Sequence, residues 1–381
     1  MHTLPPLSLY VHIPWCVQKC PYCDFNSHGL KQAVPEQEYI SHLLQDLQQD
    51  AELVPNREVQ TIFIGGGTPS LFSAEAMADL LHGIKQRIPL AKDAEITMEA
   101  NPGTFEKDRF AGFVQAGINR ISIGVQSFQN DKLTTLGRIH GPTEAVAAAQ
   151  HADTIGLNSF NLDLMHGLPG QNIDEALDDL QRAIALSPPH LSWYQLTIEP
   201  NTLFHSKPPT LPEDEILWDI QERGESLLKQ NGYEQYEVSA YSKPGFQCQH
   251  NLNYWRFGDY LGVGCGAHGK ITDLNTQQIT RTEKVKHPKG YMDLTKSYTF
   301  KSWQVQKEDL PFEFFMNRFR LLEPCPVSEL EMYTGLSTET PIVRQAIDSA
   351  TTKGLMTENQ QEWYVTRKGR LFLNELLNEF L

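Results

Sequence analysis

The first 230 residues alternate between short apolar runs and longer amphipathic segments, and this alternation limits the folds open to the chain. The apolar runs are strand-like and cover residues 7–13, 60–64, 95–99, 120–125, 159–165 and 190–198. The segments between them have helical periodicity and include residues 35–53, 74–87, 104–116, 173–186 and 213–230. Recurring strand–helix units predict a parallel sheet with crossover helices. Because about six units are too few for an eight-stranded barrel, we predict an α/β fold with a partial, open parallel β/α barrel.

Residues with distinctive chemistry follow the predicted strands directly. Three cysteines come after the first strand and a glycine triplet, residues 65–67, after the second; Glu99 ends the third and Gln126 closes the fourth. In β/α barrels the loops at the carboxyl ends of the strands carry the chemistry. We therefore expect these residues to share one functional edge of the sheet.

Cys16, Cys20 and Cys23 are separated by three and then two residues, and we call residues 16–23 the cysteine loop. An iron–sulfur cluster normally takes four cysteines, so three thiolates would leave one iron of a four-iron cluster without a protein ligand. A structural zinc ion needs four ligands, and only His12 and His28 lie close enough in sequence to complete a local set. A redox Cys-x-x-Cys pair would leave Cys16 unexplained. We favour the cluster, with zinc as the alternative.

Composition restricts the partners and the compartment. The formal net charge of -15 argues against nucleic acid, whose phosphates require a basic surface. It leaves room for an acidic small molecule in a locally basic pocket. No basic N-terminal segment precedes an apolar run, and no apolar stretch has the length of a transmembrane segment. We expect a cytoplasmic protein with reduced cysteines, of which Cys248, Cys265 and Cys325 are buried apolar residues.

The cysteine spacing, with an aromatic residue before the last cysteine, resembles the radical S-adenosylmethionine superfamily. The resemblance implies a 4Fe–4S cluster on Cys16, Cys20 and Cys23, whose open iron binds the amino and carboxylate groups of S-adenosylmethionine. It also implies that the glycine-rich segment, residues 65–69, contacts the methionine amino group. Judged by its residues alone, this segment is a tight strand-to-helix turn.

Further motifs narrow the resemblance and carry it nearly end to end. They lie at residues 8–14, 65–69, 124–128, 137–138 and 166–170, and they are similar to those of the oxygen-independent coproporphyrinogen III oxidase family, which pairs this barrel with a C-terminal domain. By that analogy the S-adenosylmethionine site is lined by Tyr10, Tyr22, Gly66, Gly67, Thr68, Glu99, Gln126, Arg138 and Asp163. Glu99 and Asp163 suit hydroxyl or ammonium groups, and Arg138 suits a carboxylate. The alternative for Asp163 is a buried ion pair with Arg138.

Two departures from the oxidase point to one branch of the family, the HemW heme chaperones. Phe25 stands where the oxidase has a further cysteine, and only 15 residues precede Cys16. The sequence His-Asn-Leu-Asn-Tyr-Trp at residues 250–255 matches a motif associated with heme binding in that branch. The resemblance therefore implies heme binding by His250, Asn251, Tyr254 and Trp255.

The chemistry of this motif agrees with heme binding without requiring it. An imidazole is a common axial ligand of heme iron, and Tyr254 and Trp255 could pack on a porphyrin face. The alternative is a loop histidine beside two core aromatic residues. The glycine-dense stretch 258–269 allows close approach of a flat ligand. Within it Cys265 and His268 are secondary ligand candidates, and the alternative, which we favour for these two residues, is that they belong to the closing loop of the barrel.

The C-terminal region has the pattern of a small, mostly helical, winged-helix-like domain. Residues 310–322 and 341–353 are predicted helices, residues 355–357 and 362–365 a hairpin, and residues 367–380 a final helix. Its only basic run is Arg367, Lys368 and Arg370, which favours a covering or docking role over DNA binding. We divide the chain into a barrel (1–235), a connecting segment with the heme motif (236–298) and a C-terminal domain (299–381).

Three functions follow. The first is a heme chaperone that holds a 4Fe–4S cluster and S-adenosylmethionine, accepts heme and passes it to a recipient protein, for which a respiratory protein is one candidate. The second is an oxygen-independent coproporphyrinogen III oxidase, against which Phe25 counts. The third is a zinc protein without a redox role. We favour the first and assign no catalytic residue; a homodimer is one candidate assembly.

Overall fold

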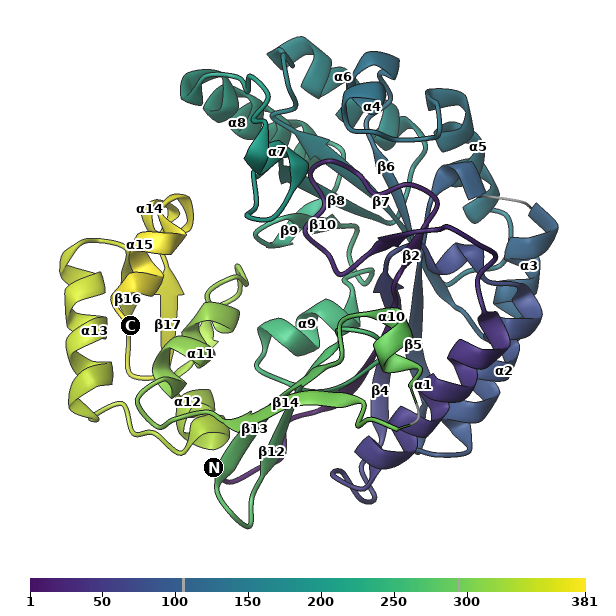
Figure 1. The fold of residues 1–381 in the computed structure, drawn as a ribbon. Coiled ribbons are helices and arrows are strands. Elements are labelled where there is room, and N and C mark those ends of the chain that lie inside the picture. The colour runs from purple at the N-terminus through teal and green to yellow at the C-terminus, as the bar shows by residue number, and fades with distance from the viewer. Residues whose placement is uncertain (105–106, 294) are drawn as a thin grey trace.

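The centre of the molecule is a curved sheet of twelve strands that stays open within the described residues, 1–104, 107–293 and 295–381, of the computed structural model (Figure 1). Its strand order is β14-β13-β12-β11-β1-β4-β5-β6-β7-β8-β10-β9. The parallel strands are β11 (Asp259–Val263), β1 (Leu7–Ile13), β4 (Val59–Gly66), β5 (Leu90–Ala100), β6 (Arg120–Gln126), β7 (Ser159–His166) and β8 (His190–Gln195). Six of them are the predicted strands, which confirms the partial, open barrel. β8 ends three residues earlier than the predicted run 190–198.

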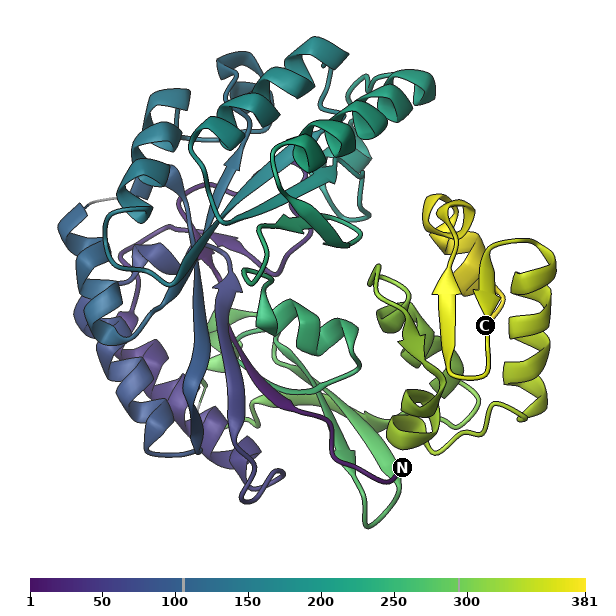
Figure 2. The ribbon, with the colours of Figure 1, turned by 180° about the vertical axis from the view of Figure 1, so that it is seen from behind.

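Helices cover the outer face of this sheet (Figure 2). They are α1 (Glu36–Ala51), α2 (Ala74–Lys85), α3 (Lys107–Ala116), α5 (Pro142–Ala152), α6 (Ile173–Ala185) and α8 (Asp214–Gln230). Residues 105–106 of the predicted helix 104–116 lie outside the described residues. The periodicity did not single out α5, because its buried face consists of alanines. None of the described helices combines the length and apolar character that a membrane span requires.

The two faces of the sheet differ in polarity. Leu9 and Val11 of β1 are fully buried in the large apolar core shared with the outer helices. The alternate residues point into the barrel, where Ser8 hydrogen-bonds Thr61 at 2.7 Å. Because side chains alternate between the faces of a strand, the same segments that build an apolar core also line a polar interior. That interior opens at the carboxyl ends of the strands.

The segment described above as connecting takes part in the sheet. β9 (Glu234–Glu237) and β10 (Ala240–Ser242) extend one edge, and α9 (Gln249–Trp255) then crosses to the other edge, where β11 pairs with β1. Three antiparallel strands follow: β12 (His268–Asp273), β13 (Gln278–Lys284) and β14 (Thr299–Gln304). Part of the glycine density serves this packing, since a Cβ on Gly262 would lie 1.9 Å from the carbonyl oxygen of His268.

The C-terminal region has its own apolar core, which includes Phe314, Phe315 and Trp363. Its elements are α11 (Leu310–Arg318), β15 (Cys325–Pro326), α12 (Val327–Thr334), α13 (Pro341–Thr352), β16 (Met356–Glu358), β17 (Glu362–Val365), α14 (Arg367–Leu371) and α15 (Leu373–Asn378). The strands form a small sheet in the order β15-β17-β16, as the predicted hairpin requires. The predicted single helix 367–380 is wrong, because Phe372, at φ -116° and ψ 47°, interrupts it.

Candidate cofactor-binding site

The cysteine loop follows β1 and is anchored where it begins, at Trp15 and Cys16. β2 (Trp15–Cys16) pairs in parallel with β3 (His28–Gly29). The N–H of Thr68 donates to the carbonyl of Trp15 at 2.7 Å. A Cβ on Gly67 would lie 2.5 Å from the same carbonyl oxygen, so the close approach excludes a larger residue there. The cysteine loop and the glycine-rich segment are therefore in direct contact.

The three thiols of the loop are half-buried and free. Burial raises the pKa of Cys16 and Cys23, and hydrogen bonds from Thr68 and Ser27 oppose that effect at Cys16. In the part of the chain that the structure describes, no three His, Cys, Asp or Glu side chains converge as ligands of one metal ion. Three thiolates on one loop fit an iron–sulfur cluster, because in a cluster each thiolate binds its own iron.

Gly66 and Glu99 form a contact between neighbouring strands. Gly66 has φ +108°, a conformation that residues with a Cβ rarely adopt. Its N–H donates to Oε2 of Glu99 at 2.9 Å. Burial raises the pKa of Glu99 from 4.5 to about 7. A buried carboxylate that accepts one hydrogen bond is well suited to accept a second hydrogen bond, for example from an ammonium group.

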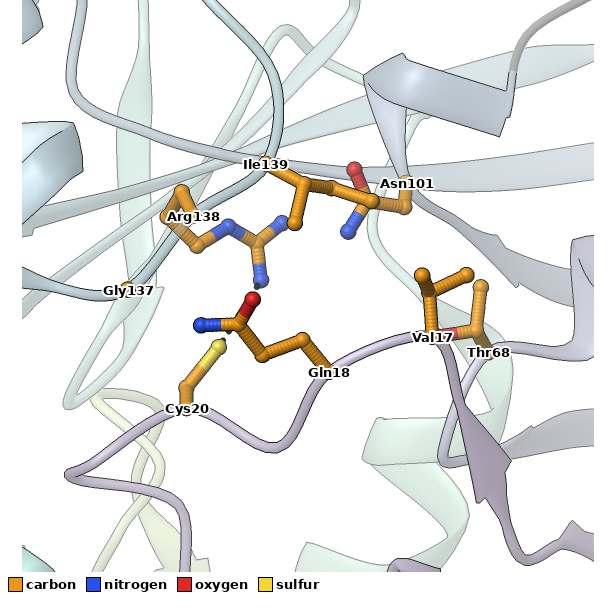
Figure 3. A pocket seen from close by; sticks show the side chains of 8 residues that line it. All are labelled: Val17, Gln18, Cys20, Thr68, Asn101, Gly137, Arg138 and Ile139. Atoms are coloured by element: carbon orange, nitrogen blue, oxygen red, sulfur yellow. Dashed lines mark hydrogen bonds between the residues drawn. The ribbon is translucent and has the colours of Figure 1, made fainter. Parts of the chain in front are cut away.

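Arg138 extends toward the cysteine loop across a narrow pocket (Figure 3). Its Nη2 donates to the carbonyl of Gly124 at 2.6 Å, and its Nη1 lies 3.7 Å from Sγ of Cys20. Its Nε has no partner among the described residues. The lining residues of this narrow pocket are Val17, Gln18, Cys20, Thr68, Asn101, Gly137, Arg138 and Ile139. A guanidinium with a free N–H beside the cysteines can bind a carboxylate.

Asp163 lies in the barrel interior and has no ion pair with Arg138. Its Oδ2 accepts a hydrogen bond from Ser122 at 2.9 Å, and its Oδ1 accepts one from Asn161 at 2.8 Å. Burial raises the pKa of Asp163. Two neutral donors satisfy this carboxyl group, which leaves Arg138 available to face the cysteine loop.

The remaining predicted residues of this site are Tyr10, Tyr22 and Gln126. Burial and the nearby Glu99 carboxylate raise the pKa of Tyr10. Burial also raises the pKa of Tyr22, and the nearby Arg138 cation partly opposes that rise. Gln126 has φ +69° at a bulge in β6 and accepts a hydrogen bond from Tyr194 at 3.0 Å. Of the nine predicted residues, Thr68 and Arg138 line the narrow pocket, whereas Tyr10 lines a different, wider cavity.

A second, wider space lies on the other side of the cysteine loop, and we call it the wide cavity. Its volume is about 860 Å³, within the range of roughly 300–1,000 Å³ that is typical of small-molecule sites. Tyr254, Trp255 and Tyr260 form an aromatic wall, and Phe25 and His268 also line it. The charged lining residues are Lys19, Lys270, Arg281 and Lys286, against the single acid Asp24. The lining is rich in cations in a chain whose net charge is -15, although Lys270, Arg281 and Lys286 each pair with a carboxylate outside it, respectively Asp259, Glu313 and Glu283.

His250 and Asn251 do not line the wide cavity, although Tyr254 and Trp255 do. The His250 side chain is buried behind Tyr254, with 4.7 Å between the ring centroids. Its Nδ1 hydrogen-bonds Oγ1 of Thr61 at 2.8 Å, and burial lowers its pKa to about 3. The structure therefore separates the two halves of the predicted motif.

Comparison with known proteins agrees with this arrangement. Residues 10–183 match the Radical SAM superfamily, and residues 305–372 match the HemN C-terminal domain. The chain is 62% identical to the heme chaperone HemW of Escherichia coli (strain K12) over 381 residues, which covers 100% of both chains. The chain belongs to the HemW family. The HemW of Bacillus subtilis (strain 168) is 33% identical and is matched over 98% of this chain and 99% of its own.

Among solved structures, coproporphyrinogen III oxidase (HemN) from Escherichia coli, a radical SAM enzyme, is similar to this HemW-family chain. The TM-score is 0.84 at 24% sequence identity, over 99% of this chain and 90% of the other. At that identity the likeness concerns the fold. The barrel and the C-terminal domain are therefore shared with an enzyme, and the function must be argued from the two cavities.

Sequence reasoning missed several residues that line the site in this HemW-family chain. Tyr194 hydrogen-bonds Gln126, and Gln18 and Asn101 line the narrow pocket. The alternation of β8 could have indicated Tyr194, which shares the inner face of the strand with Ser192. Gln18 and Asn101 lie in loops, for which the sequence contains no comparable periodic signal.

Proposed function

We propose that the chain is a heme chaperone that holds a 4Fe–4S cluster and S-adenosylmethionine and transfers heme to an acceptor protein. The main support is the full-length identity of 62% to a protein named heme chaperone HemW, combined with two chemically different cavities beside one cysteine loop. The acceptor is a separate macromolecule, for which a respiratory heme protein is our candidate.

Cys16, Cys20 and Cys23 would hold the cluster, which supplies an open iron atom. Arg138 would pair with the carboxylate of S-adenosylmethionine, since its Nε is free. Glu99 would accept the ammonium group, which favours the charged carboxylate and lowers its raised pKa. The other residues proposed to line this site are Tyr10, Tyr22, Gly66, Gly67, Thr68, Gln126 and Asp163.

Heme would occupy the wide cavity. The cavity has sufficient volume, an aromatic wall that includes Tyr254 and Trp255, and an excess of basic side chains. Aromatic rings pack well on a porphyrin face, and cations pair with propionate groups. In this proposal Asn251 and His250 support the aromatic wall from α9.

The alternative is the oxidase activity of the structurally similar enzyme. Phe25, which stands where the oxidase has a cysteine, is 58% exposed and lines the wide cavity. A phenyl group can neither ligate iron nor donate a proton, so we expect heme to be held there without decarboxylation.

The test is anaerobic reconstitution of the full chain with iron and sulfide, followed by titration with heme and with S-adenosylmethionine. Heme-loaded protein is then mixed with a heme-depleted respiratory protein, with serum albumin as the non-specific acceptor. We expect binding of both small molecules and preferential transfer of heme to the respiratory protein. Robust conversion of coproporphyrinogen III in a parallel assay, without heme transfer, would contradict the proposal.

A further inference from the structure

Three histidines line the wide cavity and one lies behind its aromatic wall, and the structure distinguishes which of these four can reach a ligand. His12, His28 and His268 line the cavity, and His250 lies behind its aromatic wall. An axial ligand of heme iron must offer an unprotonated imidazole nitrogen that faces the porphyrin. The hydrogen bonds and burial of each ring decide which residue meets that requirement.

Three of these rings are engaged or enclosed. His12 uses Nδ1 toward the hydroxyl of Tyr10 at 2.9 Å and Nε2 toward the carbonyl of Asn26 at 2.8 Å. Nε2 of His28 is buried without a partner, and its ring packs edge-on to His287, 5.4 Å between centroids.

His250 is enclosed on two sides by aromatic rings. Its ring centroid lies 5.2 Å from that of Phe63 and 4.7 Å from that of Tyr254. Its Nδ1 is bonded to Thr61, and its Nε2 is buried. The thiol of Cys265, the other candidate in this stretch, is also enclosed, since it donates to the carbonyl of Lys286 at 2.6 Å. Neither side chain borders the cavity.

His268 differs from all of these. It is the first residue of β12, its side chain is exposed, and it borders the wide cavity. No hydrogen bond within the described part of the chain occupies either of its nitrogens. Burial and the nearby cations Lys286 and Arg281 lower its pKa, which favours the neutral ring despite the opposing effect of Glu283. Tyr260 lines the same cavity.

We propose that His268 supplies the axial imidazole nitrogen to heme iron, and that His250 is a positioning residue that supports Tyr254. This inference rests on the proposed heme binding in the wide cavity. The bond formed is a coordinate bond from a ring nitrogen to iron, and a solvent or weakly held ligand leaves. Lys286 and Arg281 flank the same site, where each already pairs with a carboxylate, Glu283 and Glu313, so a propionate would have to share or displace that partner.

The experiment compares heme-loaded wild type with His268→Gly, His250→Ala and His28→Ala, using Soret spectra, EPR and the rate of heme loss to apomyoglobin. We expect His268→Gly alone to shift the Soret band and to lose heme at least about tenfold faster, because even residues that support a metal ligand are worth about 10–100-fold in affinity. Added imidazole should restore the wild-type spectrum in His268→Gly, which a purely structural role would not allow.

Two outcomes separate this inference from the proposed function. If wild type fails to bind heme, the proposed function fails and the ligand assignment fails with it. If wild type binds heme and His268→Gly keeps the same spectrum and heme-loss rate, the ligand assignment is wrong while heme binding stands. A spectral change in His250→Ala that imidazole reverses would return the assignment to His250.

Discussion

The two cavities on either side of the cysteine loop are built from the same barrel and differ in almost every physical property. The narrow pocket places Arg138 next to Cys20, and the neighbouring Glu99 carboxylate is buried with its pKa raised to about 7. The wide cavity, about 860 Å³, has aromatic walls and mostly basic charges. The cation of Arg138 and the carboxyl group of Glu99 suit a small zwitterion. The aromatic wall and the lining cations of the wide cavity suit a large, planar ligand with two negative charges.

The difference shows how one strand-end loop can serve two ligands. Gln18 and Cys20 face the narrow pocket, whereas Lys19 and residues 24–28 line the wide cavity. The narrow pocket draws its other walls from the loops that follow β4, β5 and β6, and the wide cavity draws its walls from α9, from β11 to β13 and, through Tyr10 and His12, from β1. Except at Tyr10, which is also proposed for the S-adenosylmethionine site, the two sites should respond independently to mutation, and the predictions below test that independence.

The largest expected effect is loss of the cluster. Replacing Cys16, Cys20 and Cys23 together by alanine should remove essentially all bound iron and sulfide, because no other thiols lie in the loop. Heme binding should persist at the wild-type level, since the wide cavity keeps its lining. Cys325→Ala, a buried thiol of the C-terminal core, is the control. Joint loss of cluster and heme would break the separation of the two sites.

The next effect is a pH dependence that originates at the buried carboxyl group of Glu99, beside Gly66. The pKa of Glu99 rises from 4.5 unfolded to about 7 folded, so the folded apoprotein binds the extra proton. Proton binding by Glu99 therefore stabilises the folded state fully below pH 4.5, and this stabilisation is lost as the pH rises through 7. The free energy of unfolding should fall by about 3 kcal/mol in total over that range. Glu99→Gln should therefore gain stability relative to wild type between pH 5 and 8 in urea unfolding.

The matched control for that experiment is Glu52→Gln, the same change of charge at an exposed position. Its unfolding free energy should follow the wild-type pH profile. If the unfolding free energies of wild type and Glu99→Gln depend on pH in the same way, the Glu99 carboxylate is not held in an apolar environment. The electrostatic difference between the two cavities would then be contradicted.

A smaller effect is expected behind the aromatic wall. His250→Ala removes a buried ring between Phe63 and Tyr254 and should cost about 2 kcal/mol of unfolding free energy. The heme spectrum of the folded variant should stay as in wild type. Asn251→Ala, the half-buried neighbour in α9, is the control. Loss of heme ligation at unchanged stability would place His250 in the site itself.

The smallest effect concerns charge at the rim of the wide cavity. Lys286 is 67% exposed and pairs with Glu283, and Lys296 makes a comparable pair with Asp293. Lys286→Gln and Lys296→Gln should each change stability by less than about 1 kcal/mol. Only Lys286→Gln should weaken heme binding, by about fivefold at low salt. Equal heme affinity in the two variants would show that propionates do not approach Lys286.

Much of the architecture could be predicted from local patterns. The strand and helix periods located six parallel strands and most outer helices, and the positions of strand ends predicted where Glu99 and Gln126 would meet the cysteine loop. Strand β11 escaped prediction because residues 258–269 are rich in glycine, which is depleted in strands, and β14 escaped because it is mostly exposed and lacks an apolar alternation. The break at Phe372 also lacked a proline or glycine signal.

What the sequence by itself determined is the order of the elements and the chemical types available at the strand ends, because both follow from spacing along a few residues. What only the tertiary structure decided is which way those side chains face. His250 bonds Thr61, 189 residues away, and is buried, whereas His268 opens into the cavity from the start of β12. Local periodicity contains no information on such long-range contacts, and the direction of a ligand is settled by the residues that pack behind it.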